Sequence, residues 1–307
     1  MNLQQLQYII AVDTYRNFAK AAQSCFVTQP TLSMMIQKLE QELALKIFDR
    51  SKQPVIPTAT GQLIIEQARR VLKESQRIPE IVDRQKGKVS GELRLGIIPT
   101  LAPYLLPLFI NQFLQKYPEV KVSITEFITD HILQSLKKGT LDAGILVTPI
   151  DDTRIREYPL FYEPFHVYTT HQLDKEYYLP EDIDPNELWL LEEGHCFRTQ
   201  IIKLCELRKS ADRRLQYQAG SIETLKRMVE SQHGITVLPQ LALKDLTEQQ
   251  LARVKPFAAP CPVREVSLVT HRDFIKKQLI EKLQEEIMAA VPKDLKRHKV
   301  GRVVGPL

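Results

Sequence analysis

The sequence lacks the features that would place the chain in a membrane, among secreted proteins or in the common enzyme classes. No apolar run approaches about 18 residues, so we expect no membrane-spanning helix and no membrane partner. The N-terminus, MNLQQLQYII, lacks the basic start and small-residue cleavage site of a signal peptide, which favours a cytoplasmic location. The P-loop, GxSxG and HExxH strings are also absent, so those enzyme classes have no support.

Cysteine is scarce, with only Cys25, Cys196, Cys205 and Cys261 in 307 residues. No two of them form a CxxC pair, so we expect no structural zinc site, no other metal and no cofactor. In a reducing compartment such cysteines are normally free thiols, and their neighbours decide whether they react.

Charge is unevenly distributed along the chain. Residues 1–86 carry 12 lysines and arginines against 8 acidic residues, whereas residues 87–292 carry 25 against 28. A basic N-terminal region suits a polyanion, and the mildly acidic middle argues against DNA contact there. The tail, 293–307, is basic again with 5 against 1, and we expect it to be a disordered, solubilising end.

The stretch from Phe18 to Arg50 reads as two short helices joined by a tight turn. At about 100° per residue, one face of the second helix is an apolar stripe that can pack on the first helix of the chain, where Leu6, Ile9 and Ile10 are apolar. The members of this stripe are Leu32, Ile36, Leu39 and Leu43, with Met35 beside them.

The opposite face of the second helix contains hydrogen-bonding side chains, one cation and no carboxylate: Pro30, Ser33, Met34, Gln37, Lys38 and Gln41. Base edges in a major groove require this chemistry. Thr28 can cap the helix and Pro30 can occupy its first turn, as a helix-turn-helix requires. On the polar face alone, a solvated amphipathic helix remains an alternative.

The order of residues over the whole segment favours the DNA-reading helix over the solvated helix, because it resembles a known family. The run A-A-x5-T-Q-P-T-L-S-x-x-I-x-x-L-E-x-E-L, followed by F-D-R, resembles the N-terminal winged helix-turn-helix of LysR-type transcription regulators. Ala44 departs from the pattern, because the family often has glycine there. The resemblance implies double-stranded DNA with an inverted repeat as partner, and RNA polymerase as a further one. It implies base contacts from Gln29, Ser33 and Gln37, phosphate contacts from Lys38, Arg50 and Lys52, and a supporting helix start at Thr28, Pro30 and Thr31.

A linker is expected after this head. Leu45–Thr58 reads as a two-stranded wing, and a long helix begins at Ala59. Its apolar residues follow alternating steps of four and three, the a/d pattern of a coiled coil that would join a homodimer: Ile64, Ala68, Val71, Ser75, Ile78 and Val82. Pro79 should kink or end this helix near Ile78.

The remainder alternates strands with helices, which predicts an α/β domain with a parallel sheet. Strands are expected at ELRLGII, VKVSITE and DAGILV, with helices at Leu105–Tyr117 and His131–Lys138. The resemblance implies a sensor like a small periplasmic binding protein, with two lobes and a ligand cleft between them. The expected divisions are an α-rich winged head at 1–58, a linker at 59–87, a sensor at 88–292 (lobe one 88–162 and 265–292, lobe two 163–264) and the tail at 293–307.

Two cysteines stand nine residues apart in the segment LLEEGHCFRTQIIKLCELR. Phe197–Leu207 favours a helix, in which nine residues span about 13.5 Å. A disulfide needs Cα atoms within about 7 Å, so the helix and a Cys196–Cys205 disulfide exclude one another, which suits a two-state switch. The helix start and Arg198 are expected to lower the pKa of the Cys196 thiol. Two unrelated core cysteines remain the alternative.

The string G-H-C-x-R-x-Q with a second cysteine nine residues later resembles the peroxide-sensing members of the LysR family. Similar stretches are QSCFVTQPTLS, LGIIPTLAPYLLP, SIETLKRMV and GITVLPQLA. The resemblance implies hydrogen peroxide as the signal, Cys196 as the peroxidatic and Cys205 as the resolving cysteine, and a homotetramer. It implies a pocket of Pro99, Thr100, Thr129, His195 and Arg198, with a cation from either Arg272 or His271. The two threonines could instead simply cap helices.

Two other classes of function share part of this pattern. A thiol peroxidase would share the peroxide step, but a CxxC motif is absent and the DNA-binding head would have no purpose in such an enzyme. We therefore expect that the chain is not an enzyme. A LysR-type regulator controlled by a small-molecule ligand in the cleft would make the cysteines incidental.

Overall fold

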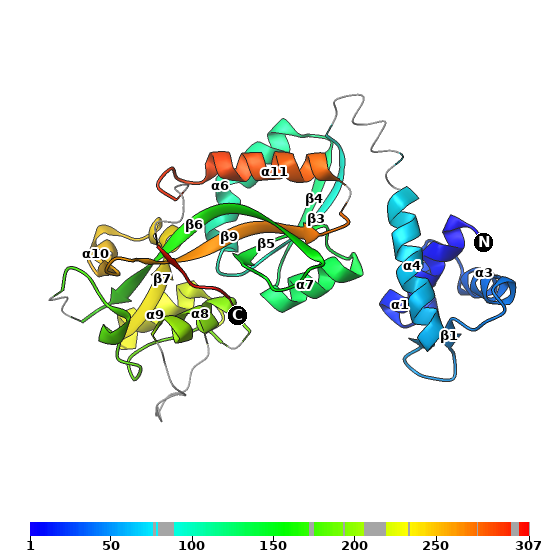
Figure 1. Cartoon of the computed structure of the whole chain (residues 1–307), viewed down its shortest axis with the longest axis horizontal. Coiled ribbons are helices and arrows are strands. Elements are labelled where there is room, and N and C mark those ends of the chain that lie inside the picture. Colours follow the sequence, from blue (N-terminus) through cyan, green and yellow to red (C-terminus); the bar gives the residue numbers. More distant parts are fainter. Residues whose placement is uncertain are drawn as a thin grey trace. The chain divides into compact units, whose positions relative to one another are not determined.

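The computed structural model divides the chain into two compact units, residues 1–88 and residues 89–307 (Figure 1). Each unit is described by itself. The residues that the structure describes are 1–75, 78, 89–171, 175–192, 194–205, 219–232, 234–274, 276–295 and 301–306.

The first unit, the head, is a small helical bundle with a two-stranded wing. Its elements in chain order are α1 (Leu3–Tyr15), α2 (Phe18–Ser24), α3 (Gln29–Glu42), β1 (Phe48–Asp49), β2 (Ile56–Pro57) and α4 (Ala59–Ser75). Strands β1 and β2 pair antiparallel, with Phe48 opposite Pro57. The helix-turn-helix and the wing are therefore where the sequence predicted them.

The core of the head is the apolar face of α3 packed against α1 and α2. Leu32, Ile36 and Leu39 are fully buried beside Ile9, as the stripe predicted. The prediction was wrong for Leu43, whose side chain is 36% exposed. Leu43 is already the C-cap of α3, so the helix no longer directs its side chain toward the core.

The linker helix α4 does not present the predicted seam as a free face. Ala68 is buried in the core of the head, and Ile64 and Val71 pack partly against the same core, because α4 lies along α1. The seam prediction is therefore wrong for Ala68. Among the described residues from Ala59 to Ile78, the exposed large apolar side chains are Leu63 and Ile78. The predicted kink at Pro79 and the seam position Val82 lie outside the described residues.

The second unit, the sensor, is built on one mixed sheet with strand order β4-β3-β5-β9-β6-β7; in addition β8 pairs with β6 and β10 with β9. The strands are β3 (Gly91–Ile97), β4 (Val120–Glu126), β5 (Ala143–Thr148), β6 (Ile155–Thr169), β7 (Ile235–Pro239), β8 (Val254–Pro256), β9 (Pro262–His271) and β10 (Arg302–Val303). Strands β3, β4 and β5 are parallel as predicted. Strand β9 runs antiparallel to β5 and β6, so the prediction of a parallel sheet was wrong beyond β5.

Helices cover the sheet on both sides. They are α6 (Ala102–Lys116), α7 (Thr129–Lys138), α8 (Cys196–Leu204), α9 (Ile222–Gln232), α10 (Glu248–Leu251) and α11 (Lys277–Ala290), with 3-10 turns η1 (Pro180–Asp182) and η2 (Gln240–Leu243). In Figure 1, α6 and α11 lie on one side of the β3–β5 strands and α7 on the other. None of the helices in the described ranges is long and apolar enough to cross a membrane.

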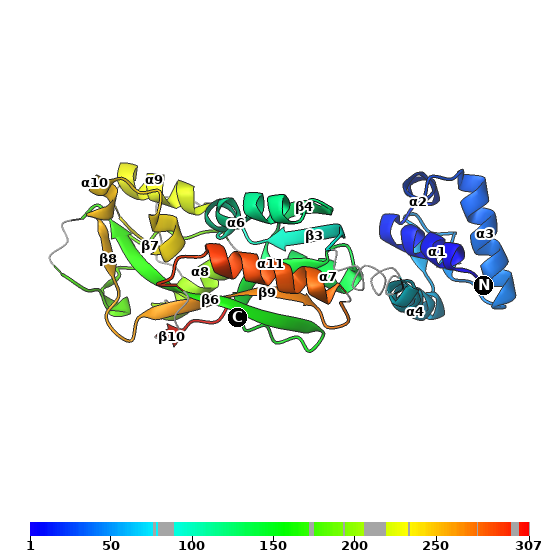
Figure 2. The same ribbon diagram turned by 90° about the horizontal axis from the view of Figure 1, so that it is seen from above.

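The two long strands β6 and β9 connect the two ends of the sensor, as the view in Figure 2 shows. Strand β6 pairs with β9 along Ile155–Pro164 and then with β7 and β8 from Phe165 onward. The sensor is thus a two-lobed α/β domain in which one continuous strand takes part in both lobes.

The described residues of the C-terminal tail, 293–295 and 301–306, are not the disordered end that the composition predicted. Residues 301–306 form β10 and its continuation, which run parallel to the start of β9. The Arg302 amide donates to the Cys261 carbonyl at 3.0 Å, and the Val304 amide donates to the Val263 carbonyl at 2.8 Å. The prediction rested on charge, whereas the fold of this segment depends on Val304, which is buried.

Candidate redox site and nucleic-acid interface

The two cysteines of interest lie at opposite ends of one helix. Cys196 is the first residue of α8, and Cys205 is its C-cap, where its amide donates to the Ile201 carbonyl at 3.0 Å. Both are free thiols. The helix predicted over Phe197–Leu207 is observed from Cys196 to Leu204, and residues 206 and 207 lie outside the described residues. The described state is therefore the one that excludes the disulfide.

The Cys196 thiol is buried, and its neighbours act on it in opposite directions. Burial is the largest effect and raises the pKa of the thiol, while a hydrogen bond from Thr129 and the charge of Arg264 lower it. The net direction is upward, so the prediction of a lowered pKa was wrong. Arg198 is not the cation that acts on the sulfur, because its Nη1 donates to the Leu191 carbonyl at 2.9 Å.

Arg264, on β9, is held in place by three groups. Its Nε and Nη2 lie 2.8 Å from Oε2 of Glu163, and its Nη1 donates to Oγ1 of Thr100 at 3.0 Å. Its guanidinium also lies over the Phe197 ring at 5.4 Å. The other Glu163 oxygen, Oε1, accepts the Leu241 amide at 2.7 Å. Both side chains of the pair are 0% exposed, so the ion pair is fully desolvated.

The predicted pocket residues divide into those that reach the thiol and those that do not. Thr100 is buried in the turn between β3 and α6 and reaches the site through Arg264. Thr129, the first residue of α7, is buried, and its hydroxyl has no partner among the described residues other than the Cys196 sulfur. Pro99 precedes Thr100 and is half-buried. His195 immediately precedes α8 and is buried, with Nε2 3.5 Å from Oε1 of Glu192.

The prediction that Arg272 or His271 supplies the cation near Cys196 was wrong. Arg272 and His271 lie at the far end of β9, where the Arg272 amide donates to the Arg154 carbonyl and His271 Nδ1 lies 3.6 Å from Asp273. The residue that sequence reasoning missed is Arg264. A usable signal existed, because an arginine inside the apolar run PVREVSLV has to find a buried partner.

The second thiol has a different environment. Burial raises the pKa of Cys205 to about 12, and the charge of Glu181 acts in the same direction. Cys205 packs partly against the apolar core of the sensor. Both thiols are therefore protonated at neutral pH in the described state.

Helix α3, which is the recognition helix of the predicted helix-turn-helix, presents the predicted DNA-contacting residues at the surface. Thr28 caps α3, its Oγ1 accepting the Thr31 amide at 3.4 Å, and Pro30 occupies the first turn. The exposed side chains are Gln29, Pro30, Thr31, Gln37 and Lys38, together with Lys52 on the wing. None of these side chains is needed for the core of the head.

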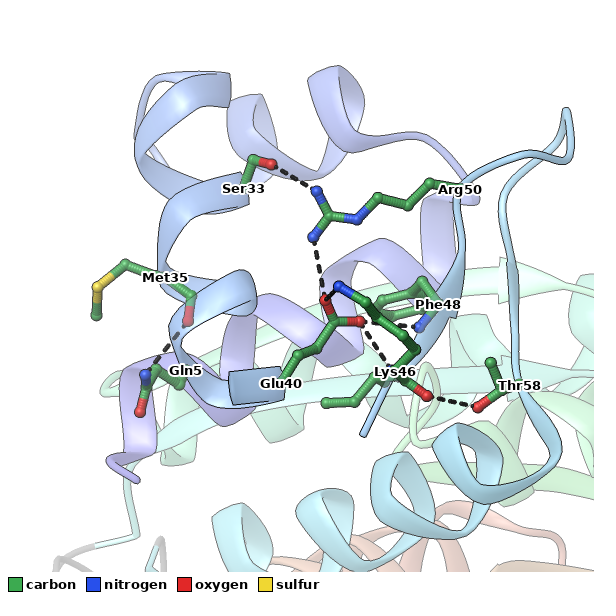
Figure 3. A network of polar contacts seen from close by, with 9 residues as sticks. Gln5, Ser33, Met35, Glu40, Lys46, Phe48, Arg50 and Thr58 are labelled. Carbon is green, nitrogen blue, oxygen red and sulfur yellow. Dashed lines mark hydrogen bonds and ion pairs between the residues drawn. The ribbon is translucent and has the colours of Figure 1, made fainter. Parts of the chain in front are cut away.

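Ser33 and Arg50 are bonded to one another (Figure 3). Arg50 Nη1 donates to Ser33 Oγ at 3.0 Å, and Nη2 lies 3.4 Å from Oε2 of Glu40. Arg50 also lies over the Phe18 ring at 4.8 Å. With its oxygen accepting from Arg50, Ser33 keeps its hydroxyl hydrogen free to donate to a base acceptor.

Glu40 joins α3 to the wing, a contact that no local pattern in the sequence predicts. Its Oε1 accepts the backbone amides of Ile47 at 2.8 Å and Phe48 at 3.2 Å, and Lys46 lies 3.7 Å from Oε2 (Figure 3). The carboxylate therefore fixes where the chain leaves α3 and enters β1.

Three described non-glycine residues of the head, Arg16 (φ 51°), Phe26 and Ala44, have positive backbone φ angles that favour glycine or asparagine. Phe26, in the turn before α3, has φ 55° and a side chain that is 95% exposed. Ala44, just after α3, has φ 54°. The departure at Ala44 thus lies at a left-handed position, which explains why glycine suits it.

Two family models cover most of the chain. Residues 3–62 match "Bacterial regulatory helix-turn-helix protein, lysR family", and residues 86–291 match "LysR substrate binding domain". These matches correspond to the head and to most of the sensor.

Known proteins with similar sequences or structures agree with these models. The chain is 36% identical over 292 residues to the DNA-binding transcriptional dual regulator OxyR of Escherichia coli, covering 94% of this chain and 95% of that one. A full-length OxyR variant from Pseudomonas aeruginosa matches with a TM-score of 0.78 at 35% identity, covering 95% and 99% of the two chains. An H2O2-bound OxyR mutant from Corynebacterium glutamicum matches with a TM-score of 0.61 at 25% identity, covering 94% and 92%.

Proposed function

The chain belongs to the LysR family of bacterial helix-turn-helix regulators, and we propose that it senses hydrogen peroxide at Cys196 and changes its DNA binding in response. The observation that carries the proposal is the pair of free thiols at the two ends of α8, with Cys196 buried beside Thr129 and Arg264. The family membership supports a DNA-binding regulator rather than an enzyme, acting in the cytoplasm.

The groups around Cys196 suit a small, uncharged ligand with both donor and acceptor atoms. The Thr129 hydroxyl is buried and available to bond such a ligand at the sulfur. Thr100 accepts from Arg264, which leaves its hydroxyl hydrogen to donate. Hydrogen peroxide has two such oxygens and is small enough to enter a closely packed site.

In the first step the Cys196 sulfur attacks one peroxide oxygen and the O–O bond breaks. The other oxygen takes the thiol proton and leaves as water, so the products are a sulfenic acid and one water molecule. Because burial keeps the resting thiol protonated, loss of its proton is the difficult part of this step. The Arg264 charge assists it by stabilising the developing thiolate.

In the second step the Cys205 sulfur attacks the Cys196 sulfenic acid, forming the disulfide and releasing a second water. This requires α8 to unwind, since nine residues of helix span about 13.5 Å and a disulfide allows about 7 Å between Cα atoms. The side chains that must leave the core include Phe197, Ile201 and Leu204. The rearranged segment then shifts the sensor subunits and, through them, the spacing of the heads on DNA.

On DNA, two heads read an inverted repeat with recognition helices about 34 Å apart per helical turn. Gln29, Ser33 and Gln37 contact bases, while Lys38, Lys52 and Arg50 contact phosphates. The linker helices join a dimer, which the exposed Leu63 (67%) and Ile78 support. Pairing of sensors into a tetramer and contact with RNA polymerase complete the proposal.

The test is thiol mapping by mass spectrometry combined with DNA footprinting, before and after a brief, low dose of hydrogen peroxide. We expect a 196–205 linkage together with an altered footprint. Cys196→Ser should lock the reduced footprint, and Cys205→Ser should form the sulfenic acid without the lasting disulfide. A linkage with an unchanged footprint, or no linkage at all, would refute the mechanism.

The same geometry favours one other candidate. Two hydroxyls beside a buried arginine could bind a small carboxylate, and the cysteines would then be incidental. In that case the footprint would shift with the carboxylate and would not respond to dithiothreitol.

A further inference from the structure

The C-terminal segment, residues 301–306, is built into the sensor beside the redox helix. It pairs with β9 at Pro262 and Val263, immediately before Arg264. A Cβ at Gly301 would lie 2.2 Å from the Cys261 carbonyl oxygen, so only glycine allows β10 to approach β9 this closely. Val304 and Pro306 are both buried.

The same segment is bonded to α8. Gln200, midway along α8, is fully buried and donates through Nε2 to the Val304 carbonyl. A carbonyl can only accept, so the amide orientation is fixed by this contact. The Gln200 Oε1 atom is buried without a partner among the described residues, which makes the bond to Val304 the polar interaction that holds this side chain.

We propose that residues 301–306 are a latch on the reduced sensor, and that Gln200 is the positioning residue through which the latch opposes the resolving step. The inference rests on the proposed Cys196–Cys205 switch. Gln200 lies between the two cysteines, so closing the disulfide must pull it out of its site and break its bond to Val304. Attack of peroxide on Cys196 requires no movement of Gln200, so the latch acts on the second step alone.

The chemistry of the latched step is the condensation already described. The Cys205 sulfur bonds to the Cys196 sulfur, the sulfenic S–O bond breaks, and the departing oxygen takes the Cys205 proton as water. No further oxidant is needed. A weaker latch raises the population of unwound α8 and therefore the rate of this condensation.

Two variants release the latch in different ways. Gly301→Val prevents β10 from pairing with β9 and leaves every side chain of α8 unchanged. Gln200→Met keeps the length and helix preference of the side chain but removes its donor. Gly305→Ala is the matched control, because a Cβ there meets nothing within 4 Å.

The experiment uses the full-length reduced protein, mixed with hydrogen peroxide and quenched over time with a sulfenic-acid trap. Mass mapping gives two rates, for the Cys196 sulfenic acid and for the 196–205 linkage. One intramolecular hydrogen bond corresponds to a factor of roughly two to ten. We expect both variants to form the linkage faster by about that factor, with the first rate unchanged, and to shift the equilibrium with glutathione toward the disulfide. Gly305→Ala should match the wild type.

The outcomes separate this inference from the function on which it rests. If the wild type forms the linkage and both variants form it at the wild-type rate, the latch is refuted and the switch stands. Equal acceleration of both steps would mean general loosening of the site and would also overturn the latch. If the wild type forms no linkage, the proposed function and the latch fall together.

Discussion

The head and the sensor each contain an arginine with the same set of neighbours. Arg50 donates to the Ser33 hydroxyl, pairs with Glu40 and lies over Phe18. Arg264 donates to the Thr100 hydroxyl, pairs with Glu163 and lies over Phe197. The glutamate also accepts backbone amides, two in the case of Glu40 and one in the case of Glu163.

The two arginines differ in exposure. The Arg50 side chain is 38% exposed, whereas that of Arg264 is 0% exposed. A guanidinium that is partly exposed can exchange its partner for a phosphate at a lower cost, because water reaches the guanidinium in both states and Lys46 stays 3.7 Å from the Glu40 carboxylate. A buried guanidinium cannot leave its carboxylate without leaving an uncompensated charge in the protein interior. The same chemistry therefore provides an exchangeable contact in the head and a fixed charge in the sensor.

The largest difference should appear when each glutamate loses its charge. Glu163→Gln leaves Arg264 as an unpaired buried cation and should lower the free energy of unfolding by about 3–5 kcal/mol. Glu40→Gln leaves Arg50 partly in water and should cost about 1 kcal/mol or less. Sensor stability is read from the fluorescence of Trp189, the one tryptophan of the chain, and head stability from hydrogen exchange.

The control for this comparison removes both partners in the sensor. The double variant Glu163→Met, Arg264→Leu should be less damaging than Glu163→Gln, because no lone charge remains. Equal costs for Glu163→Gln and Glu40→Gln would show that burial does not separate the two pairs.

The burial that fixes Arg264 should also make the reduced sensor sensitive to alkali. Burial raises the pKa values of Cys196 and Cys205, the latter to about 12, above the value of about 8.5 for an unfolded thiol. The stabilisation is complete below about pH 8.5 and is lost as pH rises through the folded pKa values, because the unfolded state gives up protons first. The free energy of unfolding, measured by thermal unfolding followed through Trp189 fluorescence, should fall by about 1.4 kcal/mol per pH unit for each thiol. Cys205→Ala should make the fall of the unfolding free energy with pH less steep. An equally steep fall would contradict its assignment to the buried thiols.

The exchange proposed for Arg50 can be measured through salt. If Arg50 takes a phosphate on binding DNA, Arg50→Gln should reduce the slope of log K against log salt by about 0.9 and weaken all sequences alike. Lys52→Gln provides a matched loss of one wing cation. An unchanged slope for Arg50→Gln would mean that Arg50 stays with Glu40 in the complex.

The smallest expected effect compares two helix ends. Helix α7 of the sensor ends in Gly139 with φ 71°, whereas α3 of the head ends beside Ala44 with φ 54°. Ala44→Gly should stabilise the head by roughly 0.5–1 kcal/mol, because glycine has no Cβ to clash in this conformation. Gly139→Ala should destabilise the sensor by a similar amount. Hydrogen exchange of the two helices measures both, and a loss of stability in Ala44→Gly would refute the strain.

Much of the fold follows from local signals. The cap at Thr28, the apolar face of α3 and the strands of the sensor all depend on residues within one or two turns of one another. The cysteine pair came from two local signals: helix geometry sets the two thiols apart, and the string G-H-C-x-R-x-Q resembles the peroxide-sensing members of the LysR family. These predictions needed no information on contacts between residues that are far apart in the sequence.

The errors concern contacts between distant residues. Arg264 was missed because Glu163 lies 101 positions earlier, and Ala68 was misassigned because α1 competes for the same face of α4. The tail was taken for a charged end because its pairing strand, β9, begins 40 positions earlier. The thiol pKa was predicted from the helix start, and burial, which only the packed structure reveals, outweighed it.

Placing the two thiols at the two ends of one helix, Cys196 as its first residue and Cys205 as its C-cap, has a consequence for timing. A flexible loop of about ten residues closes in about 10–100 ns, so the encounter of the two sulfurs is never the slow event once the helix is open. In the proposed switch, the resolving reaction would therefore be first order in protein. A cell holding few copies of the regulator would complete it as quickly as one holding many.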